Sequence, residues 1–120
     1  MKFNWCTIQV NDMEESIKFY QEIAGLAIDR KLQAGPDVEI TFLGEGETKI
    51  ELIHNKNASS VTIGPDISLG FEVTSLEEFM DFLKEKNIPV QGGPFQPNPH
   101  LKFIYVQDPN GLKVQFAQHM

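Results

Sequence analysis

Several features that define whole classes of protein are scarce or missing in this sequence. It contains one cysteine, Cys6, so no disulfide can form within the chain. No apolar run approaches the roughly 20 residues that a membrane-spanning helix needs, and we expect no membrane partner. The first residues lack the apolar stretch of a secretion signal. Together these absences predict a cytoplasmic protein.

Positive charge is also scarce. Ten lysines and arginines face 17 aspartates and glutamates, and the net charge is −7. Nucleic-acid binding needs a basic stripe along the surface, so we expect no nucleic-acid partner. An acidic balance is compatible with a cationic ligand, although it more often serves only solubility.

The familiar catalytic signatures are missing as well. The chain has no Ser-His-Asp or Cys-His arrangement, no phosphate-binding loop and no dinucleotide-binding fingerprint. Its three histidines, His54, His100 and His119, do not have the spacing of metal ligands. The function therefore has to be sought in the fold and in the surfaces that it exposes.

An internal repeat is the most informative feature that is present. The segment that begins at Val10, VNDMEESIKFY, recurs 63 residues later at Val73 as VTSLEEFMDFL. A repeat of half the chain length predicts two similar units that each contribute one face to a common structure. At 120 residues the chain is long enough for one domain with a real core.

The first copy has the pattern of a strand, a helix and three more strands. Residues 3–10 alternate with a period of two, which is typical of a strand. Asp12 and Glu15 form a capping box that begins a helix, and Gly25 ends it. Strand-like runs follow at residues 26–32, 38–43 and 49–54, separated by turn-forming residues.

The second copy repeats this order. Residues 67–73 favour a strand, and Ser75 with Glu78 begins a second helix that runs to residue 86 or 87. Residues 88–91 favour a short strand. Residues 92–99 contain three prolines, and we expect an irregular loop there. Strands at 101–106 and 112–117 should form a hairpin around the turn Asp108-Pro109-Asn110-Gly111.

These elements predict an α+β fold made of two βαβββ modules. Module one spans about residues 1–55, the connector about 56–65 and module two about 66–120, all within a single domain 1–120. We expect each four-stranded sheet to be covered by its helix on one face. The other face should stay free.

Two motifs give the chain a resemblance to a known family. The helix motif V-x-D-x-x-x-S-x-x-F-Y from Val10 and the hairpin DPNGLKVQF from Asp108 resemble the vicinal oxygen chelate superfamily. That superfamily includes glyoxalase I, the bleomycin-resistance proteins and the extradiol dioxygenases. The resemblance covers essentially the whole chain. It implies a glyoxalase-like fold whose sheets curl around a shared cleft, and it implies a homodimer, which would also cover exposed edge strands.

The resemblance also implies where metal ligands would lie. Mapped by motif, the four ligand positions of the metal enzymes are Trp5, Glu51, Ser68 and Gln115 in this sequence. An indole N–H only donates hydrogen bonds, and serine and glutamine offer only neutral oxygens. One carboxylate with two neutral oxygens is a poor set for a divalent transition ion. We therefore predict no metal and no other cofactor.

The mapped positions remain candidates for ligand binding. The period of the first strand places Trp5 on the face away from the helix, where it would line or plug a cavity; the alternative is a core tryptophan. Glu51 is predicted as an anchor for a cationic ligand or as a general base; the alternative is simple exposure or an ion pair with Lys49 or Lys113. Four further residues complete the predicted ligand-binding set as polar or stacking groups: Ser68, Gln115, Tyr105 and Phe103.

Three functions are compatible with this pattern. The first is metal-free binding of a small organic molecule, cationic or aromatic, as the resemblance to the bleomycin-resistance branch implies. The second is a lyase or isomerase of the lactoylglutathione lyase type with a degenerate or relocated metal site, in which Glu51 acts as the base. The third is a non-catalytic interaction module with a filled cleft.

Overall fold

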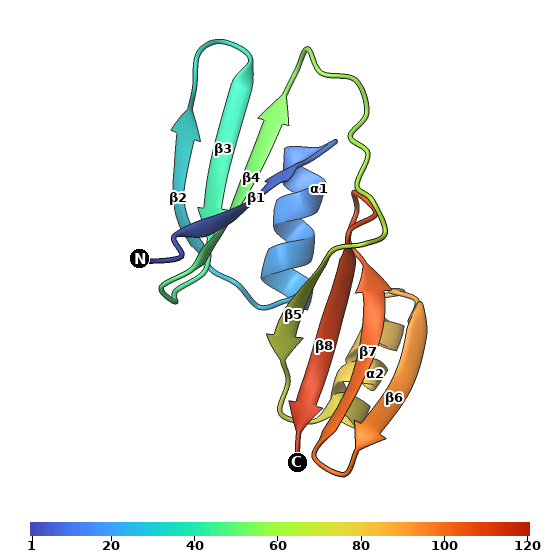
Figure 1. The fold of residues 1–120 in the computed structure, drawn as a ribbon. Coiled ribbons are helices and arrows are strands. Elements are labelled where there is room, and N and C mark those ends of the chain that lie inside the picture. The colour runs from blue at the N-terminus through green and yellow to red at the C-terminus, as the bar shows by residue number, and fades with distance from the viewer. The chain divides into compact units, whose positions relative to one another are not determined.

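Two four-stranded sheets, each with one helix, make up the protein in the computed structural model, which describes residues 1–120 (Figure 1). The chain divides into a first unit, Met1–Thr62, and a second unit, Ile63–Met120. The first unit contains β1 (Trp5–Gln9), α1 (Met13–Lys18), the π-helical segment η1 (Phe19–Ile23), β2 (Ile28–Gln33), β3 (Val38–Leu43) and β4 (Lys49–Asn55). The second contains β5 (Ser68–Glu72), α2 (Leu76–Glu85), β6 (Gly92–Asn98), β7 (Leu101–Gln107) and β8 (Lys113–His119).

The two sheets share one topology. Their strand orders are β1-β4-β3-β2 and β5-β8-β7-β6. In each sheet the first strand of the unit runs parallel to the last, and the remaining pairs are antiparallel. This arrangement confirms the α+β fold and the two βαβββ modules that the repeat predicts.

Both helices begin at the predicted capping residues. Asp12 Oδ1 accepts a hydrogen bond from the backbone N–H of Glu15 at 2.9 Å, and Ser75 Oγ accepts one from that of Glu78 at 3.2 Å. A side-chain oxygen at this position satisfies an N–H group that has no partner within the helix. The first helical segment ends before Gly25, whose φ of 72° is in the left-handed region that glycine tolerates best.

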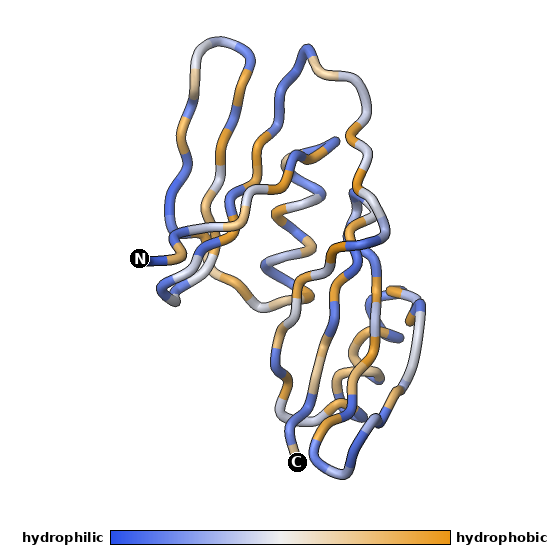
Figure 2. The backbone as a smooth tube through the Cα atoms, viewed as in Figure 1, coloured by the Kyte–Doolittle hydropathy of each residue, from blue (hydrophilic) through white to orange (hydrophobic).

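The core of each unit lies between its helix and the covered face of its sheet. Figure 2 shows hydrophobic and hydrophilic residues alternating along the strands, which is the pattern of a sheet with one buried face. Tyr20 on η1 and Leu83 on α2 occupy equivalent positions of the repeat, and both are fully buried. Phe116 of β8 packs against Phe79 of α2 with ring centroids 4.4 Å apart.

The region of residues 88–99 differs from the prediction. Residues 88–91 form no strand, and the predicted irregular loop contains the edge strand β6 instead. Only Gly92, Phe95 and Asn98 are paired in register with β7, and the register shifts twice between them. Pro94 and Pro97 fall between the paired residues, so their missing N–H groups remove no paired position. An edge strand with bulges accepts proline where a central strand would not.

The predicted hairpin between the last two strands is confirmed. Asp108 Oδ1 accepts hydrogen bonds from the backbone N–H groups of Asn110 at 2.8 Å and Leu112 at 2.9 Å. Gly111 has a φ of 86°, as its place in the turn requires.

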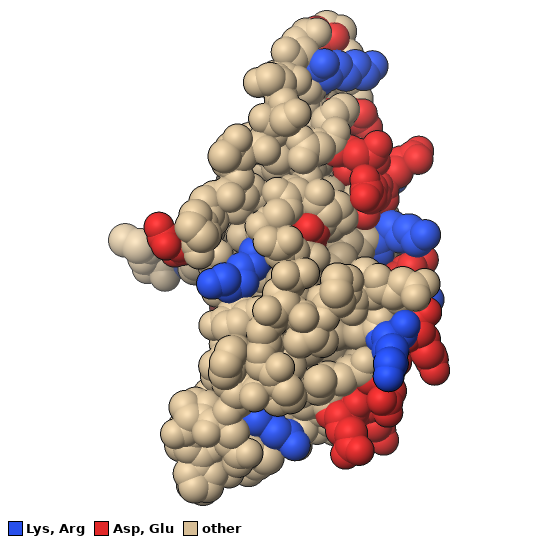
Figure 3. Space-filling view, turned by 90° about the vertical axis from the view of Figure 1, so that its right-hand side faces the viewer, with Lys and Arg blue, Asp and Glu red and all other residues tan.

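The exposed faces of both helices are acidic. Glu14, Glu15 and Glu22 lie on the first helical segment, and Glu77, Glu78, Asp81 and Glu85 on the second; all are exposed. Figure 3 shows clusters of carboxylates with lysine and arginine side chains between them. No helix is long and apolar enough to cross a membrane.

Candidate functional site

The free face of each sheet, which we define as the face opposite the helix, carries the predicted site residues. In the first unit, four side chains form a row across β1, β4, β3 and β2, namely Thr7, Glu51, Phe42 and Arg30. The Arg30 guanidinium lies 4.5 Å above the centre of the Phe42 ring, and the Trp5 ring meets Phe42 edge-on at 5.6 Å. Phe42 is therefore buried on a face that no helix covers.

Glu51 lies near the middle of this row. Its Oε1 accepts a hydrogen bond from Thr7 Oγ1 at 2.5 Å, and the side chain is only partly buried. No ion pair is formed: Lys49, one of the two expected partners, donates to the carbonyl of Gly44 at 2.6 Å and lies 3.9 Å from Asp29. A half-buried carboxylate without a counter-charge is costly to keep, and a bound cation or donor would lower that cost.

Trp5 is not a core residue. It remains 46% exposed, although its neighbours Ile8 and Val10 on the same strand segment are buried. The alternation of burial along β1 places the tryptophan ring on the free face together with Thr7 and Gln9. A large exposed ring beside a carboxylate offers both a stacking surface and a charge.

The second unit has an equivalent row across β5, β8, β7 and β6. It consists of Gly70, Gln115, Tyr105 and Gly92. Gln115 Nε2 donates a hydrogen bond to the Tyr105 hydroxyl at 3.3 Å, and Lys113 Nζ lies 5.0 Å from the centre of the Tyr105 ring. Lys113, the other partner expected for Glu51, thus lies over a ring of its own unit.

Three aromatic rings extend this second row. Phe103 lies 5.5 Å from Tyr105 and 5.5 Å from Phe95, measured between ring centroids. Phe95 is 47% exposed. The sequence reasoning missed it because it falls in the segment predicted as a loop; the signal was an aromatic residue between two prolines, which an edge strand tolerates.

The mapped metal-ligand positions have the same relative placement in both units. Trp5 pairs in register with Lys49, two residues before Glu51, and Ser68 pairs with Lys113, two residues before Gln115. Ser68 is exposed, and Gln115 is partly buried. The correspondence is what the internal duplication requires.

The chemistry of these positions does not fit a divalent metal ion. Glu51 is the only anionic group among them, and Trp5 has no atom that can coordinate a metal. No three or more histidine, cysteine, aspartate or glutamate side chains are grouped so that they could hold an ion. A catalytic zinc site normally uses about three good protein ligands.

Comparison with known proteins shows the family to which the chain belongs. The family model described as the Glyoxalase/Bleomycin resistance protein/Dioxygenase superfamily matches residues 2–116. A probable lactoylglutathione lyase of Synechocystis is 30% identical over 122 residues, which cover 92% of this chain and 90% of the relative. A lactoylglutathione lyase of Neisseria meningitidis is 28% identical and covers 92% of this chain and 86% of the relative.

Solved structures agree with this fold. The trypanothione-dependent glyoxalase I of Leishmania major matches with a TM-score of 0.85 at 23% identity, over 98% of this chain and 86% of the other. A glyoxalase family protein of Bacillus cereus matches with a TM-score of 0.85 at 16% identity, over 100% and 95% of the two chains. The chain therefore belongs to the glyoxalase/bleomycin resistance protein/dioxygenase superfamily.

Proposed function

We propose that the protein binds a small organic molecule that is aromatic or cationic, and that it does so without the divalent metal of the superfamily's enzymes. The observation that carries this proposal is the half-buried, unpaired carboxylate of Glu51 beside the exposed ring of Trp5. A flat ligand would stack on the ring. A positive charge or an N–H donor on the same ligand would pair with the carboxylate.

The free energies of these contacts are large enough to give measurable binding of a small molecule. A cation over an aromatic ring contributes about 0.5–2 kcal/mol, depending on how far it is shielded from water. A hydrogen bond to a charged group contributes about 1.5–3 kcal/mol. The Phe42 and Tyr105 rings already have Arg30 and Lys113 over them, so the Trp5 ring and the Phe95–Phe103 pair are the surfaces left for a ligand.

A second candidate is a lyase or isomerase of the lactoylglutathione lyase type. The names of the relatives in Neisseria meningitidis and Synechocystis favour it. In this case Glu51 would serve as the general base, since it is the only carboxylate at the mapped positions. Thr7, which donates to Glu51 Oε1, would hold that oxygen in place.

Trp5 provides the experiment, because it is the only tryptophan in the chain. We expect aromatic cations to change its fluorescence in a saturable way. Glu51→Gln should weaken their binding by about tenfold or more, the loss that a charged pair implies. The matched control is Glu47→Gln, which removes the same charge at an exposed site beside Lys2. If a broad panel of aromatic and cationic compounds leaves the emission unmoved, the binding proposal is wrong.

Metal analysis separates the two candidates. Protein incubated with zinc, nickel, manganese or iron and freed of excess ion should carry no stoichiometric metal. If an ion is retained and turnover of the hemithioacetal of glutathione and methylglyoxal depends on it, the lyase is supported. Loss of that turnover in Glu51→Gln would then assign the base.

The proposal includes a cytoplasmic homodimer. The edge strand β2 has five exposed residues out of six and contains no proline, so it presents free backbone groups that a second chain can cover. Light scattering coupled to size-exclusion chromatography should report twice the 13.6 kDa mass of one chain. A mass of one chain at all concentrations tested would contradict the dimer.

A further inference from the structure

The first unit contains a hollow at the end of its sheet, where the parallel strands β1 and β4 both finish. Its volume is about 360 Å³. This is within the range of about 300–1,000 Å³ that small-molecule sites occupy. The polar groups that line it come from three segments of the unit, and they are Gln9, Asn11, His54, Asn55, Lys56, Ser59 and Ser60.

The chain that follows β4 is held in place by hydrogen bonds. The backbone N–H of Lys56 donates to the carbonyl of Asp37 at 2.9 Å, and Asn57 Nδ2 donates to Asp37 Oδ2 at 2.8 Å. Further along, the N–H of Val61 donates to Asn11 Oδ1 at 2.8 Å. The segment that follows β4, residues 56–61, is therefore hydrogen-bonded at both ends to the rest of the unit.

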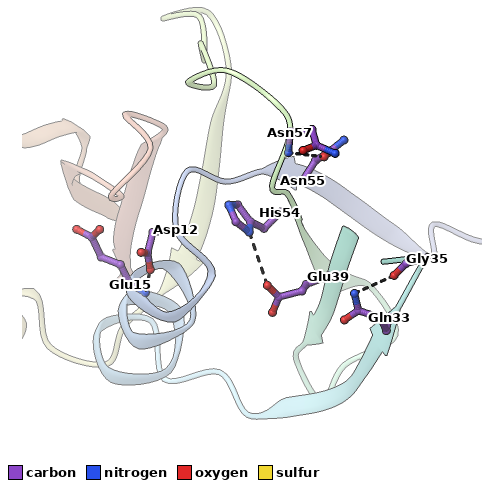
Figure 4. Close-up of polar contacts among 8 residues, drawn as sticks. All are labelled: Asp12, Glu15, Gln33, Gly35, Glu39, His54, Asn55 and Asn57. Atoms are coloured by element: carbon purple, nitrogen blue, oxygen red, sulfur yellow. Dashed lines mark hydrogen bonds and ion pairs between the residues drawn. The ribbon is translucent and has the colours of Figure 1, made fainter. Parts of the chain in front are cut away.

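His54 lies in this hollow with one ring nitrogen unsatisfied. Its Nδ1 is buried and has no hydrogen-bond partner, and the nearest carboxylate oxygen, Glu39 Oε1, is 3.7 Å away (Figure 4). That distance is too long for a hydrogen bond but suits an ion pair with a protonated ring. Buried polar atoms without a hydrogen-bond partner are rare, and this one is oriented toward Glu39.

The charge of the lining is opposite to that of the whole protein. The chain has a net charge of −7, yet no aspartate or glutamate lines the hollow. Lys56 supplies an ammonium group to the lining. Ser59 and Ser60, both exposed, add two hydroxyl groups to the same lining.

From this lining we infer that the hollow binds a small oxyanion, a phosphate or carboxylate group. Lys56 provides the charge, and Ser59 and Ser60 donate hydrogen bonds to the oxygens. His54 lines the same hollow and lies close enough to report on the bound anion. This inference does not depend on what binds at Trp5 and Glu51.

Nuclear magnetic resonance of the whole chain provides the test. Inorganic phosphate and, separately, acetate are titrated at constant ionic strength, with sodium chloride as the blank. We expect saturable shifts of the His54 ring and of the Ser59 and Ser60 amides, with no movement of the His100 and His119 rings. Saturation by phosphate, by acetate or by both identifies the anion. If neither saturates, or if all three histidines move together, the inference is wrong.

Two substitutions in the hollow and one control outside it sharpen the test. Lys56→Met should weaken binding of the effective anion by about tenfold, the effect of losing one charge-assisted contact. Lys84→Met on α2 removes the same charge outside the hollow and should leave binding unchanged. Ser60→Ala should cause a smaller loss. An unchanged affinity in the folded Lys56→Met protein would overturn the assignment.

Discussion

The two units of this protein have the same backbone design and different chemistry on their free faces. Across the four strands, the first row contains Thr7, Glu51, Phe42 and Arg30, and the second contains Gly70, Gln115, Tyr105 and Gly92. An aromatic ring stands at the same place in both rows. The neighbouring carboxylate of the first unit is replaced by a neutral amide in the second.

The flanking positions differ in size as well as in charge. Both outer positions of the second row are glycine, and a Cβ atom at Gly70 would lie 3.3 Å from Gln115 Oε1. At Gly92 the added Cβ atom would lie 3.3 Å from the Phe95 ring. Duplication has preserved the register of the strands, while the side chains on the free faces have diverged.

The edge strands show a similar divergence. Strand β2 is regular apart from one register shift and carries Asp29, Arg30 and Lys31 at its edge. Strand β6 has two prolines and two register shifts. The β2 edge therefore keeps its backbone groups free between charged side chains, whereas proline interrupts the β6 edge.

The largest expected effect tests whether the equivalent core positions are equally important. Tyr20→Ala and Leu83→Ala should each lower the free energy of unfolding by about 3–5 kcal/mol, because both side chains are fully buried. Urea denaturation followed by circular dichroism measures the loss, and Tyr20→Phe keeps the ring as a control. A cost below about 1 kcal/mol at only one position would break the equivalence of the two helices.

A second prediction concerns a crowded glycine in the edge strand β6 of the second unit. Gly93 has a φ of 95°, and a Cβ there would lie 2.8 Å from the carbonyl oxygen of Phe103. Gly93→Ala should cost about 2–3 kcal/mol through this clash and the strained backbone. Gly46→Ala is the matched control, since nothing lies within 4 Å of its added Cβ. Equal melting temperatures for the two variants would show that β6 adapts freely.

The helix caps allow a more direct comparison. Asp12→Ala and Ser75→Ala each remove a hydrogen bond to a backbone N–H and should destabilise the protein by about 1 kcal/mol. Asp12→Asn and Ser75→Thr retain an accepting oxygen and should recover most of the loss. Thermal unfolding measures these differences. If only one cap matters, the two helices contribute unequally to stability.

The smallest expected effects lie in the two rows. Thr7→Val removes the only side-chain hydrogen bond of Glu51 and should cost about 0.5–1 kcal/mol, since the threonine is exposed. Tyr105→Phe removes the longer bond from Gln115 and should cost no more than about 0.5 kcal/mol. Chemical denaturation of both variants gives the comparison. A larger cost for Tyr105→Phe would place the more important polar contact in the second unit.

Much of this architecture can be predicted from local sequence. The capping boxes at Asp12 and Ser75, the turn at Asp108 and the apolar stripes of the helices each depend on residues a few positions apart. Because the sequence repeats, a helix or strand assigned in one unit predicts the equivalent element in the other unit. The motif mapping likewise places Trp5, Glu51, Ser68 and Gln115 at corresponding strand positions, because a duplicated register preserves their spacing.

The contacts that define the candidate sites depend on residues far apart in the chain. Thr7 reaches Glu51 across 44 residues, and Phe95 joins Phe103 and Tyr105 only because β6 pairs with β7 through two bulges. The hollow beside His54 forms where β1, β4 and the segment after β4 come together. By itself, the sequence determined the elements and the duplication, since these depend on local periodicity and capping. Only the tertiary structure decided which side chains lie over the aromatic rings, because strand pairing and register create those contacts. For the same reason it decided that Glu51 has no ion pair and that His54 Nδ1 has no hydrogen-bond partner.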